Sequence, residues 1–236
     1  LCQTAQAVED LRLLVQSRYP ILYVETFEEE RLEQILATVA AELGTPFWTW
    51  SVTTGLWRRG TDQPAYETTQ PLAALRHLSS IRTGGLYLLR DFHPYLTDPV
   101  VVRQLREFAH EQDGGAVTLV LCSPALELPI ELRKLSARYQ LALPDETEIR
   151  RTVIETFRQL GQSRKLRYEL DEEGLRRLVR NLRGLTLPEV RRLVARSAFD
   201  DLALTAEDVP RVLAAKRDAV ERAGLLEFVA IDSEVA

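Results

Sequence analysis

The chain has 236 residues, of which 45% are hydrophobic and 28% are charged, and its formal net charge is −5. This length is ample for a buried core, and the composition is that of ordinary globular proteins. Since no apolar run is long enough to cross a bilayer and no basic stripe stands out against the acidic balance, we expect neither a membrane span nor a nucleic-acid partner.

Cysteine usage indicates the compartment. Cys2 and Cys122 are the only cysteines, and Cys122 follows the apolar run 117–121, where a buried free thiol is expected. The chain starts at Leu1, contains no methionine and shows no basic and apolar leader. We therefore expect a cytoplasmic protein and treat the sequence as a fragment of a longer one.

The first 144 residues alternate between helical and strand-like segments. A helix over 6–18 precedes the first strand, and further helices are expected at 28–43, 71–81 and 99–111, the last capped by Asp98. Apolar runs typical of buried strands lie at 21–24, 47–52, 86–89, 117–121 and 139–143. This alternation predicts an α/β fold with about five parallel strands and helices on both faces.

The strand signal stops after Pro144. Helices are expected near 146–160, 172–182, 187–199 and 206–220, with cap candidates at Asp145, Asp171, Thr186 and Thr205. The sequence therefore predicts an α/β domain over 1–144, a small all-helical subdomain over 145–222 and a linker or tail over 223–236.

The turn after the first strand lacks the parts of a phosphate loop. Such a loop needs glycines, free backbone N–H groups and a lysine. Here the strand runs into Phe27 and then Glu28, Glu29 and Glu30, and the chain has no glycine before Gly44 and no lysine before Lys134. Carboxylates at a helix start stabilise the helix and repel an anion. Conventional triphosphate binding at this turn is therefore not expected.

Polar residues at two later strand ends are the candidates for chemistry. Asp91 ends a buried strand where related folds hold magnesium, but Phe92 follows it instead of a water-activating glutamate. A structural role is favoured for Asp91, with a catalytic or metal role, together with His93, as the alternative. Ser123 could sense a terminal phosphate, but a serine before a proline also commonly starts a turn.

Basic and aromatic residues give weaker candidates for contacts with partners. Arg133, Lys134 and Arg138 precede the last predicted strand, where a cation could reach a neighbouring subunit's phosphate. Trp48 and Trp50 alternate along one strand, and Trp57 follows closely. Tryptophans often anchor interfaces, although core packing is the favoured interpretation for these three.

Taken in order, these segments resemble the AAA+ ATPase module. The resemblance is carried by the strand end at Asp91, the strand end at Ser123, the run 128–133, the Leu-Pro-Asp-Glu run at 143–146 and the glycine turn and helix at 182–190. It implies a sheet in the order 5-1-4-3-2 followed by a helical lid, with Arg150 or Arg151 at the family's lid arginine.

A closer resemblance is to cyanobacterial and plastid-encoded AAA+ proteins known as a hypothetical chloroplast reading frame. It covers nearly the whole chain and rests on the segments 17–21, 27–31, 50–53, 91–94 and 222–228. In that family an intact ATPase domain follows a degenerate first domain. The resemblance therefore implies that ATP and Mg²⁺ bind in the later domain, and it places the protein in the cyanobacterial cytosol or the plastid stroma.

The favoured hypothesis is a catalytically silent AAA+-like domain without a cofactor of its own. It would act as an assembly or partner-binding module, with its own C-terminal ATPase domain, neighbouring subunits and a further protein as partners. One alternative is a receiver-like signalling domain, which requires the strand order 2-1-3-4-5. Another is an ATPase with an atypical nucleotide site.

Overall fold

The structure is a computed structural model that describes residues 3–204 apart from positions 62, 66, 82–83, 113–114, 116, 126, 164–166, 169 and 202. The chain divides into two compact units, one within residues 3–142 and the other from residue 143 onward. Thr205, the predicted helix 206–220 and the predicted tail 223–236 lie outside the described residues.

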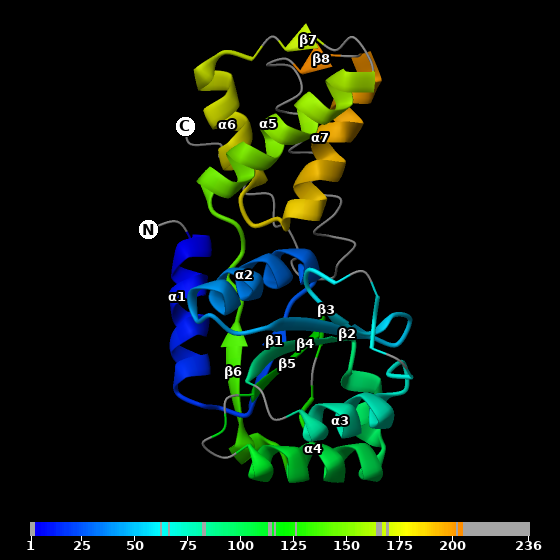
Figure 1. Cartoon of the computed structure of the whole chain (residues 1–236). Helices are drawn as coiled ribbons and strands as arrows, with labels where there is room; N and C mark the ends of the chain where they lie inside the picture. Colours follow the sequence, from blue (N-terminus) through cyan, green and yellow to red (C-terminus); the bar gives the residue numbers. More distant parts are fainter. Residues whose placement is uncertain are drawn as a thin grey trace, which may run out of the picture. The chain divides into compact units, whose positions relative to one another are not determined.

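The first unit is built on a six-stranded sheet in the order β3-β2-β4-β5-β1-β6 (Figure 1). Its strands are β1 (Ile21–Glu25), β2 (Phe47–Ser51), β3 (Gly55–Arg58), β4 (Gly85–Arg90), β5 (Val117–Ser123) and β6 (Ser136–Gln140). All neighbouring pairs are parallel except β2 with β3. The five strands expected from the sequence therefore lie in the predicted order 5-1-4-3-2, and the receiver-like alternative, which needs 2-1-3-4-5, is wrong.

Two details of the sheet differ from the sequence prediction. An antiparallel edge strand, β3, pairs with β2 through a turn at Gly55, whose φ of 70° favours glycine. Trp57, which the sequence placed just after the second strand, lies in β3. The last strand is also earlier than predicted, since β6 covers 136–140 and the apolar residues 141–143 follow it. Arg138 is therefore inside β6 and not before it.

Helices cover both faces of the sheet, as predicted. On one face α1 (Gln3–Gln16) and α2 (Glu29–Glu42) pack on each other and bury Leu11, Leu32 and Ile35 against the strands. On the other face α3 (Pro71–Ser80) and α4 (Pro99–Glu111) share a second core. A short 3₁₀ helix, η1 (His93–Thr97), follows β4, and another, η2 (Arg133–Leu135), precedes β6.

Alternation along the strands explains the two cores. In β4, Tyr87 and Leu89 join the core on the α3 and α4 side, whereas Leu86 and Leu88 join the core on the α1 and α2 side. A strand buried on both faces reads as a continuous apolar run, and this is why β4 and β5 are apparent in the sequence.

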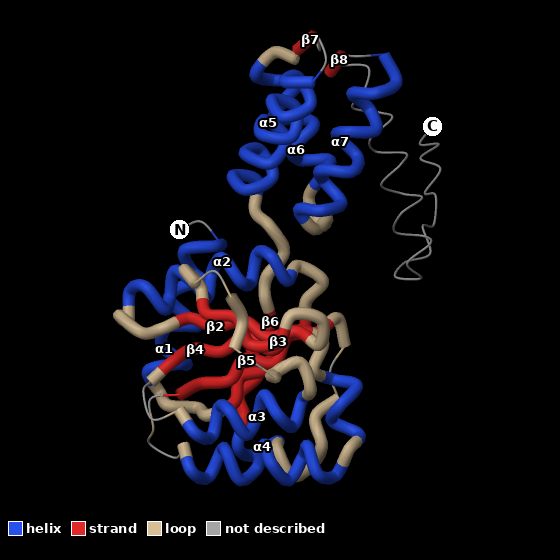
Figure 2. The backbone as a smooth tube through the Cα atoms, turned by 45° about the vertical axis from the view of Figure 1, so that its right-hand side comes forward, coloured by secondary structure: helices blue, strands red, loops and turns tan. Residues whose placement is uncertain are grey.

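The second unit contains α5 (Glu146–Ser163), α6 (Glu172–Leu182) and α7 (Leu187–Asp201) around its own apolar core (Figure 2). The predicted subdomain is not purely helical, because β7 (Arg167–Tyr168) and β8 (Ala203–Leu204) form a small parallel sheet. No helix in the described part of the chain is long and apolar enough to span a membrane.

Several helices begin at the capping residues that the sequence predicted. Asp98 accepts a hydrogen bond from the Val100 N–H at 2.8 Å, and Asp171 accepts one from the Gly174 N–H at 2.7 Å. Asp145 forms a reciprocal capping box with Glu148, in which each side chain accepts a hydrogen bond from the other residue's N–H. These local bonds fix the helix starts that the sequence indicated.

Candidate functional site

The candidate site is the carboxyl edge of the sheet, where the segments after β1, β4 and β5 meet. The backbone holds this edge together, because the Thr26 N–H donates to the Ser123 carbonyl at 3.0 Å and the Asp91 N–H donates to the Cys122 carbonyl at 2.9 Å. Ligands of open parallel sheets bind at such an edge. The chemistry of the site therefore depends on the side chains that these three segments present.

A buried ion pair occupies the turn between β1 and α2. The Glu28 and Arg31 side chains are only 3% and 6% exposed, and Arg31 Nη1 lies 3.0 Å from Glu28 Oε2. The same guanidinium nitrogen donates to the Ala142 carbonyl at 2.6 Å, just beyond β6. The Glu28 N–H donates to Thr26 Oγ1 at 3.0 Å. Side chains of the protein itself thus satisfy a backbone N–H and a buried cation at the place where a phosphate loop would hold its anion.

Negative charge accumulates beside this pair. Partial burial is the main cause that raises the pKa of Glu29 above its usual value, and the nearby Asp91 carboxylate adds to the effect while Arg90 opposes it. Arg90, at the end of β4, forms an ion pair with Glu33 of α2. The cation of the β4 end is therefore already paired with a carboxylate.

Asp91 lies at the rim of this site with its side chain 60% exposed. Its φ of 47° is in the left-handed region, which aspartate tolerates better than most residues. His93 Nδ1 is 4.0 Å from Asp91 Oδ1, too far for a hydrogen bond. Within the described residues no group of three or more His, Cys, Asp and Glu side chains could hold a metal ion. Asp91 and His93 thus lack a third ligand.

Ser123 and its neighbour point inward. The Ser123 hydroxyl is buried and donates to the Ala125 carbonyl at 3.0 Å, which closes its own turn. Burial raises the pKa of the Cys122 thiol to about 12, and the carboxylates of Glu29 and Asp91 contribute. Ser123 has the geometry of a turn residue, and the Cys122 thiol stays protonated at neutral pH.

The three basic candidates do not converge on one point. Arg133 Nε donates to the Leu128 carbonyl at 3.2 Å, and Lys134 is exposed in η2. Arg138 Nη2 lies 2.7 Å from Glu25 Oε2 on the neighbouring strand. Arg133 and Arg138 therefore already have partners within their own unit, and Lys134 remains open to solvent.

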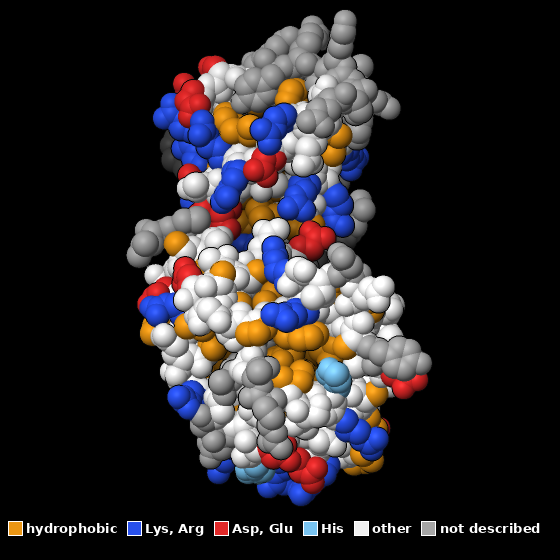
Figure 3. Space-filling view, viewed as in Figure 1, with side chains coloured by type: hydrophobic (Ala, Val, Ile, Leu, Met, Phe, Trp, Pro, Cys, Tyr) orange, Lys and Arg blue, Asp and Glu red, His pale blue; other side chains and the backbone are white. Residues whose placement is uncertain are grey.

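The three tryptophans have different surroundings. Trp50 is 1% exposed, donates from Nε1 to the Thr68 carbonyl at 2.7 Å and makes an edge contact with Phe92. Trp48 is half-buried and stacks on Tyr87 with ring centroids 5.9 Å apart. Trp57, at the sheet edge, is 37% exposed. Trp50 belongs to the core, whereas Trp57 is partly exposed and donates from Nε1 to the Thr61 carbonyl at 2.9 Å. Figure 3 shows apolar side chains at the surface of the first unit, in the region of β2 and β3.

Two arginines of the site, Arg31 and Arg90, were not among the sequence candidates. The signal for Arg31 was its position three residues after Glu28, since residues three apart on a helix are neighbours. Its contact with Ala142 spans 111 residues of sequence. No local sequence pattern predicts a contact between residues so far apart in the chain.

Comparison with known proteins agrees with this architecture. Residues 7–141 match the model of the SpoVK-like AAA ATPase N-terminal domain, and residues 147–223 match the model of the second domain of the same ATPases. The chain belongs to the SpoVK-like AAA ATPase family. The resemblance to AAA+ proteins seen in the sequence is thereby confirmed.

Curated relatives of the SpoVK-like chain are AAA domain-containing proteins named ycf46. The chain is 30% identical to one from Guillardia theta over 94% of its own length, and 26% identical to one from Pyropia yezoensis over 93%. These matches cover 43% and 44% of the two relatives, so the chain spans less than half of their length.

Solved structures show the same fold at low sequence identity. The FIGL-1 AAA domain in complex with ADP has a TM-score of 0.55 and 16% identity, covering 87% of this chain and 78% of that domain. C. elegans PCH-2 has a TM-score of 0.57 and 10% identity, covering 93% of this chain and 69% of the other.

Membership of the SpoVK-like family implies nucleotide and Mg²⁺ in general, but the turn between β1 and α2 does not fit them. The buried charge of Arg31 is already matched by Glu28, and Glu29 and Asp91 add negative charge beside it. A triphosphate would have to displace an internal ion pair and approach two further carboxylates. The residues of this turn therefore do not fit a bound nucleotide.

Proposed function

We propose that this chain is a catalytically silent AAA domain that serves as an assembly or partner-binding module of a larger AAA ATPase. The single observation that carries the proposal is the buried Glu28–Arg31 pair in the turn between β1 and α2. This turn belongs to a sheet of the AAA type but lacks the groups that hold phosphate, and the chain also carries a helical subdomain. Such a domain keeps the shape of an ATPase module without its chemistry.

Energetics support this proposal. Breaking a buried ion pair costs about 3–5 kcal/mol, because one charge is left without compensation in a medium of low polarity. An incoming phosphate would carry that penalty together with repulsion from the carboxylates of Glu29 and Asp91. Phosphate loops avoid both the broken ion pair and the repulsion, since their backbone N–H groups and lysine are free to bind an anion.

The proposal extends to the rest of the protein. ATP and Mg²⁺ would bind in a C-terminal ATPase domain, and that domain and neighbouring subunits would be the partners of this one. The domain limits that we propose are 1–144, 145–222 and 223–236. The resemblance to plastid and cyanobacterial proteins supports a location in the plastid stroma or the cyanobacterial cytosol.

Isothermal titration of the purified chain with magnesium–ATP tests the proposal. We expect heats no larger than those of dilution, while an AAA domain with an intact phosphate loop serves as the positive control. Saturable binding at micromolar concentrations would contradict a silent domain. Turnover that is abolished by Asp91→Ala would instead support the atypical ATPase, because Asp91 is the exposed carboxylate at the end of β4.

A further inference from the structure

A pocket of about 640 Å³ lies at the amino edge of the sheet, opposite the carboxyl edge. The turn after α1 contributes Arg18 to its lining, the turn after α2 contributes Gly44 and Thr45, and the starts of β4 and β5 contribute Gly85 and Thr118. These segments come together because β1, β4 and β5 are parallel and all begin at this edge. The volume is in the range of pockets that hold small organic ligands.

Two helices end at this pocket in the same way but with different residues. Arg18 after α1 and Gly44 after α2 have φ angles of 59° and 63°, in the left-handed region. The Arg18 N–H donates to the Val15 carbonyl at 3.0 Å, and the Gly44 N–H donates to the Ala41 carbonyl at 3.2 Å. Glycine is the usual residue at such a helix end, because a Cβ strains this conformation. The arginine after α1 therefore indicates a use for its side chain.

The charge of the pocket comes from one side chain. Among the residues that the structure describes, Arg18 is the only charged residue in the lining, and no carboxylate lines the pocket. Glu42, the last residue of α2, is next to the lining in sequence and interacts with Arg12. The carboxyl ends of α1 and α2 add partial negative charge, which offsets part of the Arg18 charge. An anion must therefore contact the guanidinium directly, as a carboxylate does through two parallel hydrogen bonds.

The rest of the lining suits an apolar ligand body. Val15, Leu43 and Pro46 provide apolar side chains. A Cβ added to Gly44 would meet no atom within 4 Å, so the space beside this glycine is open. The Thr118 hydroxyl donates to the Tyr19 carbonyl at 3.3 Å, and its oxygen can still accept a hydrogen bond. Apolar walls with few polar groups and one charge are typical of small-molecule sites.

We propose that this pocket binds a small organic carboxylate, with the carboxylate on Arg18 and an apolar body against Val15, Leu43 and Pro46. The pocket and the turn between β1 and α2 lie at opposite edges of the sheet and share no residue. The inference therefore goes beyond the proposed assembly function and does not depend on it.

Fluorine NMR of the 236-residue chain with para-fluorobenzoate as the probe tests the site. We expect the fluorine line of this probe to broaden at millimolar concentrations, but not that of para-fluorobenzyl alcohol, a neutral molecule of similar size. Inorganic phosphate should not displace the probe, because phosphate has no apolar body. A chain that leaves both lines sharp, broadens both equally or releases the probe to phosphate overturns the proposal.

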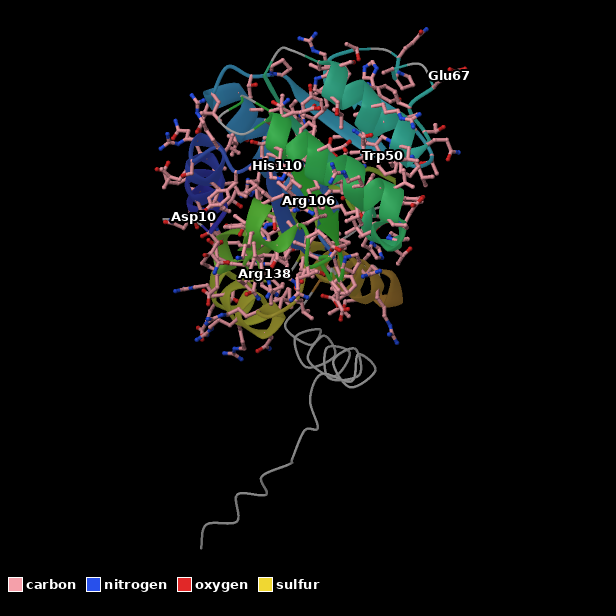
Figure 4. The ribbon with its side chains drawn as sticks, turned by 90° about the horizontal axis from the view of Figure 1, so that it is seen from below. Asp10, Trp50, Glu67, Arg106, His110 and Arg138 are labelled. Carbon is pink, nitrogen blue, oxygen red and sulfur yellow. The ribbon has the colours of Figure 1, made fainter. Side chains whose placement is uncertain are left out.

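Arg18→Gly separates binding from stability. Glycine adopts the left-handed conformation without strain, so we expect the thermal stability to be retained while the probe binds about tenfold more weakly or worse. Glu67→Gly is the matched control, since Glu67 is exposed and has a φ of 54°. Figure 4 shows Glu67 at the opposite side of the first unit from Asp10 of α1. Unchanged probe binding by Arg18→Gly would overturn the proposal.

A second pair of variants tests the pocket from the other helix end. Gly44→Asp adds a carboxylate to the lining at a residue type that tolerates the left-handed region, and it should weaken binding by repulsion of the probe. Gly184→Asp is the control, because Gly184 follows α6 with a φ of 83° and a Cβ there would also meet no atom within 4 Å. If the two variants bind the probe equally well, this pocket is not its site.

This test and the nucleotide titration have separate outcomes. A chain that binds magnesium–ATP defeats the silent domain, whatever the probe does. A chain that binds neither magnesium–ATP nor para-fluorobenzoate defeats only the carboxylate site.

Discussion

Removal of Arg31 tests whether the buried ion pair holds the turn between β1 and α2. Arg31→Ala leaves the Glu28 carboxylate 3% exposed without its cation and deletes the 2.6 Å hydrogen bond to the Ala142 carbonyl. Loss of one partner of a buried pair costs about 3–5 kcal/mol. We expect the free energy of unfolding of the first unit to fall by that amount, a large part of the ~5–15 kcal/mol typical of a domain.

The chain contains a matched control for this experiment. Glu9 and Arg12 form an ion pair at 2.6 Å with the same spacing of three residues, but on the exposed surface of α1. Solvent screens such a pair, so Arg12→Ala should leave the stability nearly unchanged. Since both variants shorten an arginine of a helix to alanine, their difference reports burial and not helix propensity.

Denaturant unfolding followed by tryptophan fluorescence is the suitable assay. All three tryptophans, Trp48, Trp50 and Trp57, lie in the first unit, so the signal is specific to it. The double variant Glu28→Leu with Arg31→Met should regain much of the lost stability, because apolar side chains of similar size often replace a buried pair without loss. Equal destabilisation by Arg31→Ala and Arg12→Ala would refute the reasoning.

Three further predictions concern single side chains. The pKa of Glu29 is raised in the folded chain, mainly by burial and then by the Asp91 carboxylate. The folded chain therefore loses stability as the pH rises from the pKa of Glu29 in the unfolded chain to its pKa in the folded chain. Glu29→Gln should therefore stabilise the chain at pH 7 but not at a pH below the pKa of Glu29 in the unfolded chain. Denaturant unfolding at a series of pH values measures this difference, and an equal gain in stability at the two pH values would refute the prediction. Gly55→Ala should destabilise the β2–β3 hairpin by more than about 1 kcal/mol, since φ is 70° and a Cβ would lie 2.7 Å from Thr68 Oγ1; an unchanged thermal midpoint would contradict this. The Cys122 thiol, with a pKa of about 12, should resist iodoacetamide in the folded chain and react after unfolding, and mass spectrometry of the labelled peptide would expose any native alkylation.

Sequence patterns predicted most of the fold because local physics determines it. The continuous apolar runs of β4 and β5 mark strands buried on both faces, and the caps at Asp98 and Asp171 are formed by atoms two or three residues away. The strand order entered through resemblance to a family and not through periodicity. β3 was missed because its four residues follow a turn and include two that are exposed.

The sequence predicted the negative charge of the site but not which of its side chains are buried. Three consecutive glutamates after β1 already indicated repulsion of phosphate, but the sequence could not tell that Glu28 is buried and Glu30 exposed. That difference follows from the helix, which turns Glu28 and Arg31 inward together. The role of Ser123 depended likewise on where its hydroxyl points, and the structure directs it to the Ala125 carbonyl.

The turn between β1 and α2 thus combines two properties. Its polar groups are satisfied internally by Thr26, Glu28 and Arg31, which makes the start of α2 independent of any anion. Its one large apolar side chain, Phe27, is left outside. Because single exposed apolar residues are common on protein surfaces, the polar interior of the turn and not the Phe27 ring decides what this turn can bind.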